Sequence, residues 1–73
     1  MDAEDNKLVV LAKATRARTG VDGAAAIRDL DGRTYAAAAV SLPSLQVSAI
    51  GAAVSMAISS GAQGLEAVLL NAD

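Results

Sequence analysis

The stretch GAAAIRDLDGRTYAAAAV, residues 23–40, decides the fold of this 73-residue chain. Two short alanine-rich runs, residues 23–29 and 33–40, lie on either side of a Leu-Asp-Gly tripeptide. A three-residue hairpin loop needs a residue of positive φ, and Gly32 supplies it. Alanine favours a helix on propensity alone, but the shortness of both runs and the turn between them predict two strands of a β-hairpin.

Helices are expected on both sides of this hairpin. In residues 3–18, apolar side chains recur at spacings of three and four, and acidic residues precede basic ones, as the helix dipole favours. Residues 45–59 carry a second apolar stripe, formed by Val47, Ile50, Val54 and Ile58. After this predicted helix, the continuously apolar run at 66–70 is typical of a buried strand.

The element order is therefore α-β-β-α-β. We predict a single small α/β domain over residues 1–73, in which the helices pack on a three-stranded mixed sheet. The hairpin strands are expected to be antiparallel, and the third strand, reached by a right-handed crossover from the second, is expected to lie parallel to the first. The predicted core consists of Leu8, Leu11, Ile27, Val40, Val47, Ile50, Val54, Ile58, Val68 and Leu70.

Size and composition limit how such a domain is stabilised. A chain this short buries a modest core and often needs disulfides, a metal or oligomerisation, yet this sequence has no Cys and no His. Association with another chain is the expected route, because structural zinc sites use thiolates and imidazoles. The acidic start and the lack of an apolar run of about 18 residues predict a cytoplasmic protein without a signal peptide or membrane span.

Five short blocks follow one another in a recognisable order. They are GAA at 23–25, DGR at 31–33, AAVS at 38–41, SAI at 48–50 and EAV at 66–68. Their order and spacing resemble those of the cytidine deaminase family over residues 6–71, with an extra residue in the hairpin and a shorter segment before the second helix. The resemblance implies the α-β-β-α-β unit that forms the first half of a cytidine deaminase.

The same resemblance shows which functional groups are missing. Zinc deaminases bind the metal with Cys or His at the start of the second helix and with two later Cys, while a Glu transfers protons. Here Ser48 stands at the first ligand position and Ile50 at the Glu position. Ala39 and Ser41 replace the Asn and Glu that bind ribose in the family. We therefore expect a vestigial pocket at these four positions, with no catalytic residue, no metal and no cofactor.

The resulting hypothesis is a non-catalytic interaction or scaffold protein that acts as a homo-oligomer or as a small subunit of a larger complex. Gly51, Ala52 and Ser55, small residues of the second predicted helix, are the candidate interface positions. Short actinobacterial deaminase-like proteins, which this chain resembles, tend to be encoded beside a ribosome-assembly GTPase. That resemblance implies a ribosome-maturation context and a protein or ribonucleoprotein partner.

Two other functions stay open at this point. One is a nucleoside-binding sensor that uses the vestigial pocket, although the missing Asn and Glu make a nucleoside an unexpected ligand. The other is cytidine deamination, which Ile50 disfavours because it cannot transfer a proton. An RNA-binding basic patch would consist of Lys13, Arg16, Arg18, Arg28 and Arg33. With Tyr35 as the sole aromatic and a net charge of −2, solvated basic side chains are the simpler interpretation.

Overall fold

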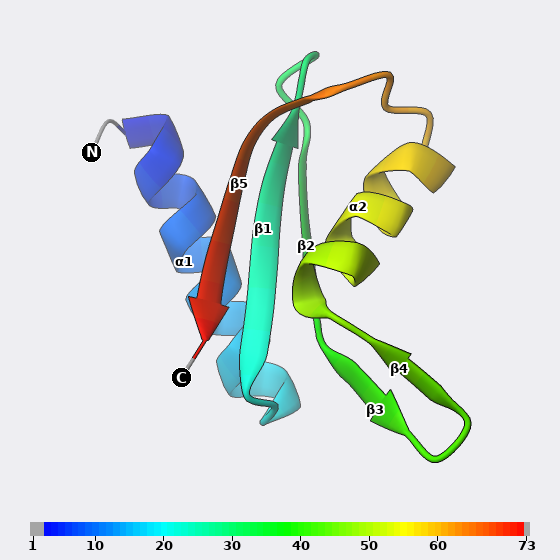
Figure 1. Ribbon diagram of the computed structural model, residues 1–73. Helices are drawn as coiled ribbons and strands as arrows, with labels where there is room; N and C mark the ends of the chain where they lie inside the picture. The colour runs from blue at the N-terminus through cyan, green and yellow to red at the C-terminus, as the bar shows by residue number, and fades with distance from the viewer. Residues whose placement is uncertain (1–2, 73) are drawn as a thin grey trace.

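The computed structural model describes residues 3–72. Its elements are α1 (Ala3–Thr19), β1 (Gly23–Asp29), β2 (Thr34–Ala38), β3 (Val40–Leu42), β4 (Leu45–Val47), α2 (Ala49–Ser59) and β5 (Leu65–Ala72). A sheet in the order β2-β1-β5 forms the middle layer, and α1 and α2 cover its opposite faces (Figure 1). The α/β class is confirmed, with one additional hairpin, β3–β4, inserted before α2.

The central hairpin forms as the sequence predicts. β1 and β2 are antiparallel, with Ala25 opposite Ala37 and Ile27 opposite Tyr35. Gly32 has a φ of 86°, a conformation that side chains with a Cβ rarely adopt, and it closes the turn. β2 is shorter than the predicted 33–40 strand, because the chain leaves the sheet after Ala38 and enters the second hairpin.

The last strand runs in a different direction from the one expected. β5 is antiparallel to β1, with Ala26 opposite Leu69, so the prediction of a mixed sheet with a strand parallel to β1 was wrong. β2 and β5 lie on either side of β1 and are each antiparallel to it, which makes them parallel to one another. The crossover through α2 therefore connects two parallel strands that are not neighbours.

A short hairpin replaces the predicted first turn of the second helix. β3 and β4 pair through Val40–Val47, Ser41–Gln46 and Leu42–Leu45. This ribbon projects beyond the lower end of the sheet in Figure 1. The helix begins at Ala49 rather than at residue 45, because Ser48 supplies the N-cap.

Alanine forms most of the core. On the α2 side, Ala25, Ile27, Ala37, Ala49 and Ala53 pack together, and on the α1 side the buried cluster is Leu8, Ala12 and Ala26. Small side chains on facing elements let the helices lie close to the sheet. Leu8 and Ile27 are the predicted core residues that are fully buried.

The apolar stripe of α2 does not face the sheet as predicted. The buried row is Ala49, Ala53 and Ala57, one turn apart. Leu11, Val40, Val47 and Val54 are only partly buried, while Ile50, Ile58, Val68 and Leu70 are exposed. The core prediction was wrong for these last four residues, because the alanine row fits against the alanine strands more closely than larger side chains would.

Candidate functional site

The start of α2 holds Ser48, the residue that the sequence analysis placed at a zinc-ligand position. Ser48 is exposed and extended, and its Oγ accepts a hydrogen bond of 2.9 Å from the backbone N–H of Gly51. Its carbonyl oxygen accepts another, of 2.8 Å, from Ala52. Ser48 thus acts as a helix cap. Ile50 follows in the first turn with 39% of its surface exposed.

The other two predicted pocket residues lie before this helix. The N–H of Ala39 donates to the carbonyl of Gly23 at 3.0 Å, and its side chain packs against the α2-side cluster. Ser41 is exposed in β3, opposite Gln46. Ala39 therefore lies beside the α2 core, whereas Ser41 lies on the projecting ribbon.

Hollows on the surface lie away from these four residues. One of about 350 Å³ lies between α1 and β2, where Val10 and Thr34 are among its lining residues. Another, of about 560 Å³, lies at the C-terminal end of α1, beside Arg16 and Asn71. Neither hollow is lined by Ala39, Ser41, Ser48 or Ile50.

The residues at the start of α2 do not fit zinc. The family's metal needs thiolate or imidazole donors, and this sequence contains neither Cys nor His. The one polar side chain at the expected ligand position is the Ser48 hydroxyl, which already caps the helix. In the part of the chain that the structure describes, no three His, Cys, Asp or Glu side chains are grouped so that they could hold a metal ion.

The hairpin turn is built around a buried carboxylate. Asp29 is 1% exposed, and its Oδ1 accepts hydrogen bonds of 2.9 Å from the backbone N–H groups of Asp31 and Arg33. Its Oδ2 accepts from Arg33 Nε at 3.1 Å and from the Tyr35 hydroxyl at 3.0 Å. The sequence analysis did not identify Asp29 as a buried group. The signal available was the Asp-x-x-x-Arg-x-Tyr spacing around a turn.

These contacts shift the pKa of Asp29 and that of Tyr35. Burial alone would raise the pKa of the Asp29 carboxyl, but hydrogen bonds from Arg33, Tyr35 and Asp31, with the charge of Arg33, lower that pKa below its ordinary value. Burial raises the pKa of the Tyr35 hydroxyl, and its hydrogen bond to Asp29 raises it further. A fully bonded carboxylate of this kind stabilises the turn and has no spare lone pair directed at a substrate.

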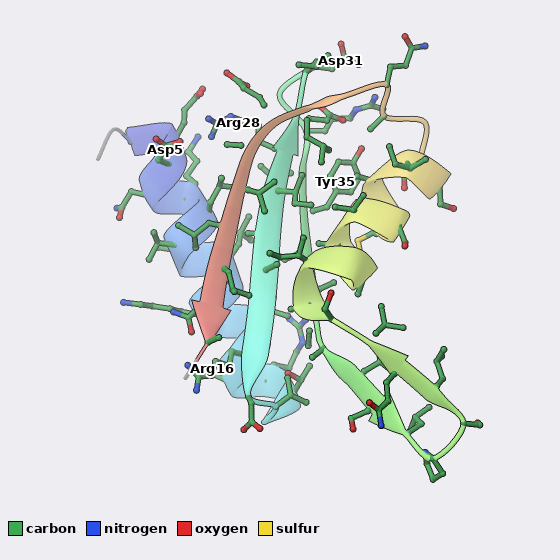
Figure 2. All side chains as sticks on the ribbon, in the orientation of Figure 1. Asp5, Arg16, Arg28, Asp31 and Tyr35 are labelled. Atoms are coloured by element: carbon green, nitrogen blue, oxygen red, sulfur yellow. The ribbon has the colours of Figure 1, made fainter. Side chains whose placement is uncertain are left out.

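A second buried charge joins α1 to the sheet. Arg28 points from β1 toward Asp5 on α1 (Figure 2). Its Nη2 donates to Asp5 at 3.1 Å and its Nε donates to Glu66 on β5 at 3.0 Å, while Glu4 lies 3.8 Å away. The hydrogen bonds to Asp5 and Glu66 raise the pKa of the guanidinium. Three carboxylates around one arginine make this end of the sheet locally acidic, which disfavours an anionic ligand there.

The five basic residues weighed as an RNA-binding patch do not form a continuous surface. Arg28 is buried among carboxylates, and Arg33 pairs with Asp29 and Asp31, each at 3.1 Å. Arg16 Nη1 donates to the side chain of Asn71 at 3.1 Å. Arg28 and Arg33 are therefore neutralised within the sheet and the hairpin turn.

The exposed surface of α2 and β5 is unusually apolar. Ile58 is 53% exposed, Val68 46% and Leu70 51%, and Leu42 and Leu45 are exposed at the tip of the β3–β4 ribbon. Of the predicted interface residues, Ser55 is exposed, whereas Gly51 and Ala52 are partly buried, and Ala52 packs against the α2-side cluster. Of these exposed aliphatic residues, Ile58, Val68 and Leu70 are ones that the sequence analysis had assigned to the core.

Comparison with models of protein families gives a match. A family model described as cytidine deaminase-like matches residues 1–73, the whole sequence. No curated protein matches the chain significantly. Neither helix within residues 3–72 combines the length and apolarity needed to cross a bilayer.

Proposed function

Because the chain belongs to the cytidine deaminase-like family, we propose that it is a non-catalytic member that acts through association. It would function as a homo-oligomer or as a small subunit bound to a larger protein. The observation that carries this proposal concerns which residues of α2 cap the helix and which are exposed. The family's ligand position holds a capping serine, and the large aliphatic residues of the helix face outward.

The chemistry of the first turn of α2 supports the loss of catalysis. Deamination by this family needs a metal-bound water and a carboxylate that transfers protons. Ser48 is engaged with the N–H of Gly51, and Ile50 has no titratable group. Removal of the ribose-binding side chains at Ala39 and Ser41 weakens nucleoside binding as well.

The exposed aliphatic residues support association. Contiguous apolar surface on a soluble domain marks sites where another macromolecule binds. A chain of this length, without Cys or His, gains stability by covering that surface with a partner. Ribosome maturation in the cytoplasm is the context that we propose, and it rests on the resemblance to short actinobacterial deaminase-like proteins.

Affinity capture of the tagged chain from its native cell extract, at moderate salt and with nuclease treatment, tests this proposal. A stoichiometric protein that survives nuclease, or a defined oligomer of the bait, is the expected result. Light scattering on the purified chain distinguishes the two forms, because a homo-oligomer gives a mass above that of one copy.

Activity and ligand assays test the catalytic side independently. Zinc analysis should find no stoichiometric metal, and uridine release from cytidine should equal the background. Titration with cytidine to millimolar concentration should leave the amide signals of Ser41 and Ser48 unmoved. Saturable shifts of those signals would replace our proposal with a nucleoside sensor, and uridine release would replace it with an enzyme.

A further inference from the structure

One edge of β5 is paired and the other is not. β5 pairs with β1 at every residue except Glu66, which lies at a register shift, and within residues 3–72 no other strand pairs with β5. An apolar edge strand of this length, with no Lys or Pro, exposes a row of N–H and C=O groups that pair readily with another strand. Its one irregularity is a register shift opposite Arg28 and Asp29, near its start.

The backbone hydrogen bonds show which residues face that open edge. The carbonyl of Gly23 accepts from Ala39, and the N–H of Asp29 donates to Arg33. The odd-numbered residues of β1 therefore point their backbone groups at β2, and the even-numbered ones point theirs at β5. Ala24, Ala26 and Arg28 lie opposite Asn71, Leu69 and Ala67. It follows that the N–H and C=O groups of Val68, Leu70 and Ala72 face away from β1.

The exposed side chains of β5 lie on the α2 side of the sheet. Ala67 and Leu69 pack against the α1-side cluster, so the alternation of a strand places Val68 and Leu70 on the opposite face. There α2 packs over Ala25, Ile27 and Ala37 of β1 and β2, and it leaves Val68 and Leu70 about half exposed.

An apolar flank of α2 borders this uncovered strip. Ile50, Val54 and Ile58 follow one another at successive turns beside the buried alanine row. Val54 packs on the same buried cluster as Leu65 of β5, which places this flank on the β5 side of the helix. Strand and helix thus both present exposed aliphatic side chains on the α2 side of the sheet, beside an open strand edge.

We propose that β5 pairs antiparallel with β5 of a second copy of this chain, joining two three-stranded sheets into one of six strands. The inference rests on the proposed function, because it names the surface through which self-association takes place. Val68 would lie opposite Leu70 of the second copy, and Leu69 would lie on the two-fold axis. The four aliphatic side chains at positions 68 and 70 then meet on one face, between the two α2 helices.

The register follows from the backbone and from charge. In an antiparallel ladder, residues that face the open edge must lie opposite one another, which pairs even-numbered residues with even-numbered ones. Of the registers that satisfy this condition, those centred on Val68 (residues 65–71) and on Leu69 (residues 66–72) give the longest ladders, and they are equal in length. We choose the one centred on Leu69 because it leaves out Leu65, which lies beyond the register shift of β5. Glu66, the one charged residue of β5, then lies opposite Ala72, so no like charges meet. Glu66 is also neutralised by Arg28 at 3.0 Å.

Single substitutions with a matched control test the surface. Sedimentation equilibrium of the full chain should give a monomer–dimer constant for the wild type, Leu70→Lys, Val68→Lys and Val10→Lys. Placing an ammonium in the paired strip should weaken the dimer about tenfold or more. Val10, 60% exposed on α1, lies outside the strip, and Val10→Lys should change the constant less than about twofold. Circular dichroism of each variant shows whether it is folded.

Hydrogen exchange and a single cysteine test the register. The amides of Val68, Leu70 and Ala72 should be protected at high concentration and should exchange freely on dilution or in folded Leu70→Lys. Leu69→Cys places the chain's sole thiol on the two-fold axis, at a non-hydrogen-bonded pair whose Cα separation of about 4.5 Å suits a disulfide. It should give a covalent dimer on oxidation, whereas Val10→Cys should not.

The outcomes separate this inference from the proposed function. A dimer that is unaffected by Leu70→Lys and leaves the three amides unprotected overturns the β5 interface and keeps self-association. If those amides are protected only in a complex with another protein, β5 pairs with that protein and not with a second copy. The proposed role as a subunit then stands. A monomer at every concentration, with no captured partner, overturns both.

Discussion

The hydroxyl of Tyr35 donates a 3.0 Å hydrogen bond to Oδ2 of Asp29, across the turn of the β1–β2 hairpin. Tyr35 is the sole aromatic residue of the chain, and its hydroxyl supplies the fourth hydrogen bond to the buried carboxylate of Asp29. β1 is the central strand of the sheet, so the turn that ends it also holds β2 in register. The charged network at this turn is consequently a structural element, and its substitutions should change stability.

Asp29→Asn should lower the stability of the domain at neutral pH and flatten its dependence on acid. The pKa of Asp29 is depressed in the folded state, so its stabilisation is present above the unfolded pKa of about 3.9 and is lost as the pH falls through the lower folded pKa. Urea unfolding of the wild type and the variant from pH 7 to pH 2 should show curves that converge at low pH. Asp31→Asn, at an exposed residue of the same turn, is the matched control and should cost less stability at pH 7 than Asp29→Asn.

Tyr35 should titrate later than a free tyrosine when the pH rises. Its raised pKa means that its contribution to stability is present below the unfolded pKa of about 10 and is lost as the pH rises through the higher folded pKa. Phenolate absorbance reports on this residue alone, because the chain has one Tyr and no Trp. Asp29→Asn should move the midpoint down toward that of the urea-unfolded chain; an unmoved midpoint would contradict the hydrogen bond as a cause.

Ser48→Ala should destabilise the domain by about 1 kcal/mol, because the N–H of Gly51 loses its acceptor. Ser55→Ala is the matched control, since Ser55 is exposed and lies within the same helix. Its effect should stay within about 0.5 kcal/mol. Urea unfolding at pH 7 measures both. Equal effects of the two substitutions would mean that the Ser48 hydroxyl is not acting as a cap.

Enlarging the alanine row should be more harmful than truncating the large residues beside it. Ala53→Leu should cost about 1–3 kcal/mol, because Ala53 is fully buried against β1 and β2. Ile58→Ala removes an exposed side chain and should cost the monomer less than about 0.5 kcal/mol. Thermal unfolding at low protein concentration, where association does not contribute, measures both. The opposite order would restore the core predicted from the sequence.

The sequence by itself determined the features that depend on neighbouring residues. The Asp31-Gly32 turn, the short flanking runs and the acidic-to-basic order of residues 3–18 were enough to predict the hairpin and the first helix, since turns and helix ends are set by local backbone chemistry. The sequence also determined that thiolate and imidazole donors are absent, because composition needs no fold.

Only the tertiary structure decided which faces are covered. Hydrophobicity placed Ile50, Ile58, Val68 and Leu70 inside, yet close approach of two alanine surfaces excluded them, and that fit depends on elements far apart in the chain. The direction of β5 relative to β1 and the open edge that results are likewise outcomes of long-range packing. A residue pattern indicates which secondary structure a segment favours, whereas the packing of segments against one another decides which of its faces is buried.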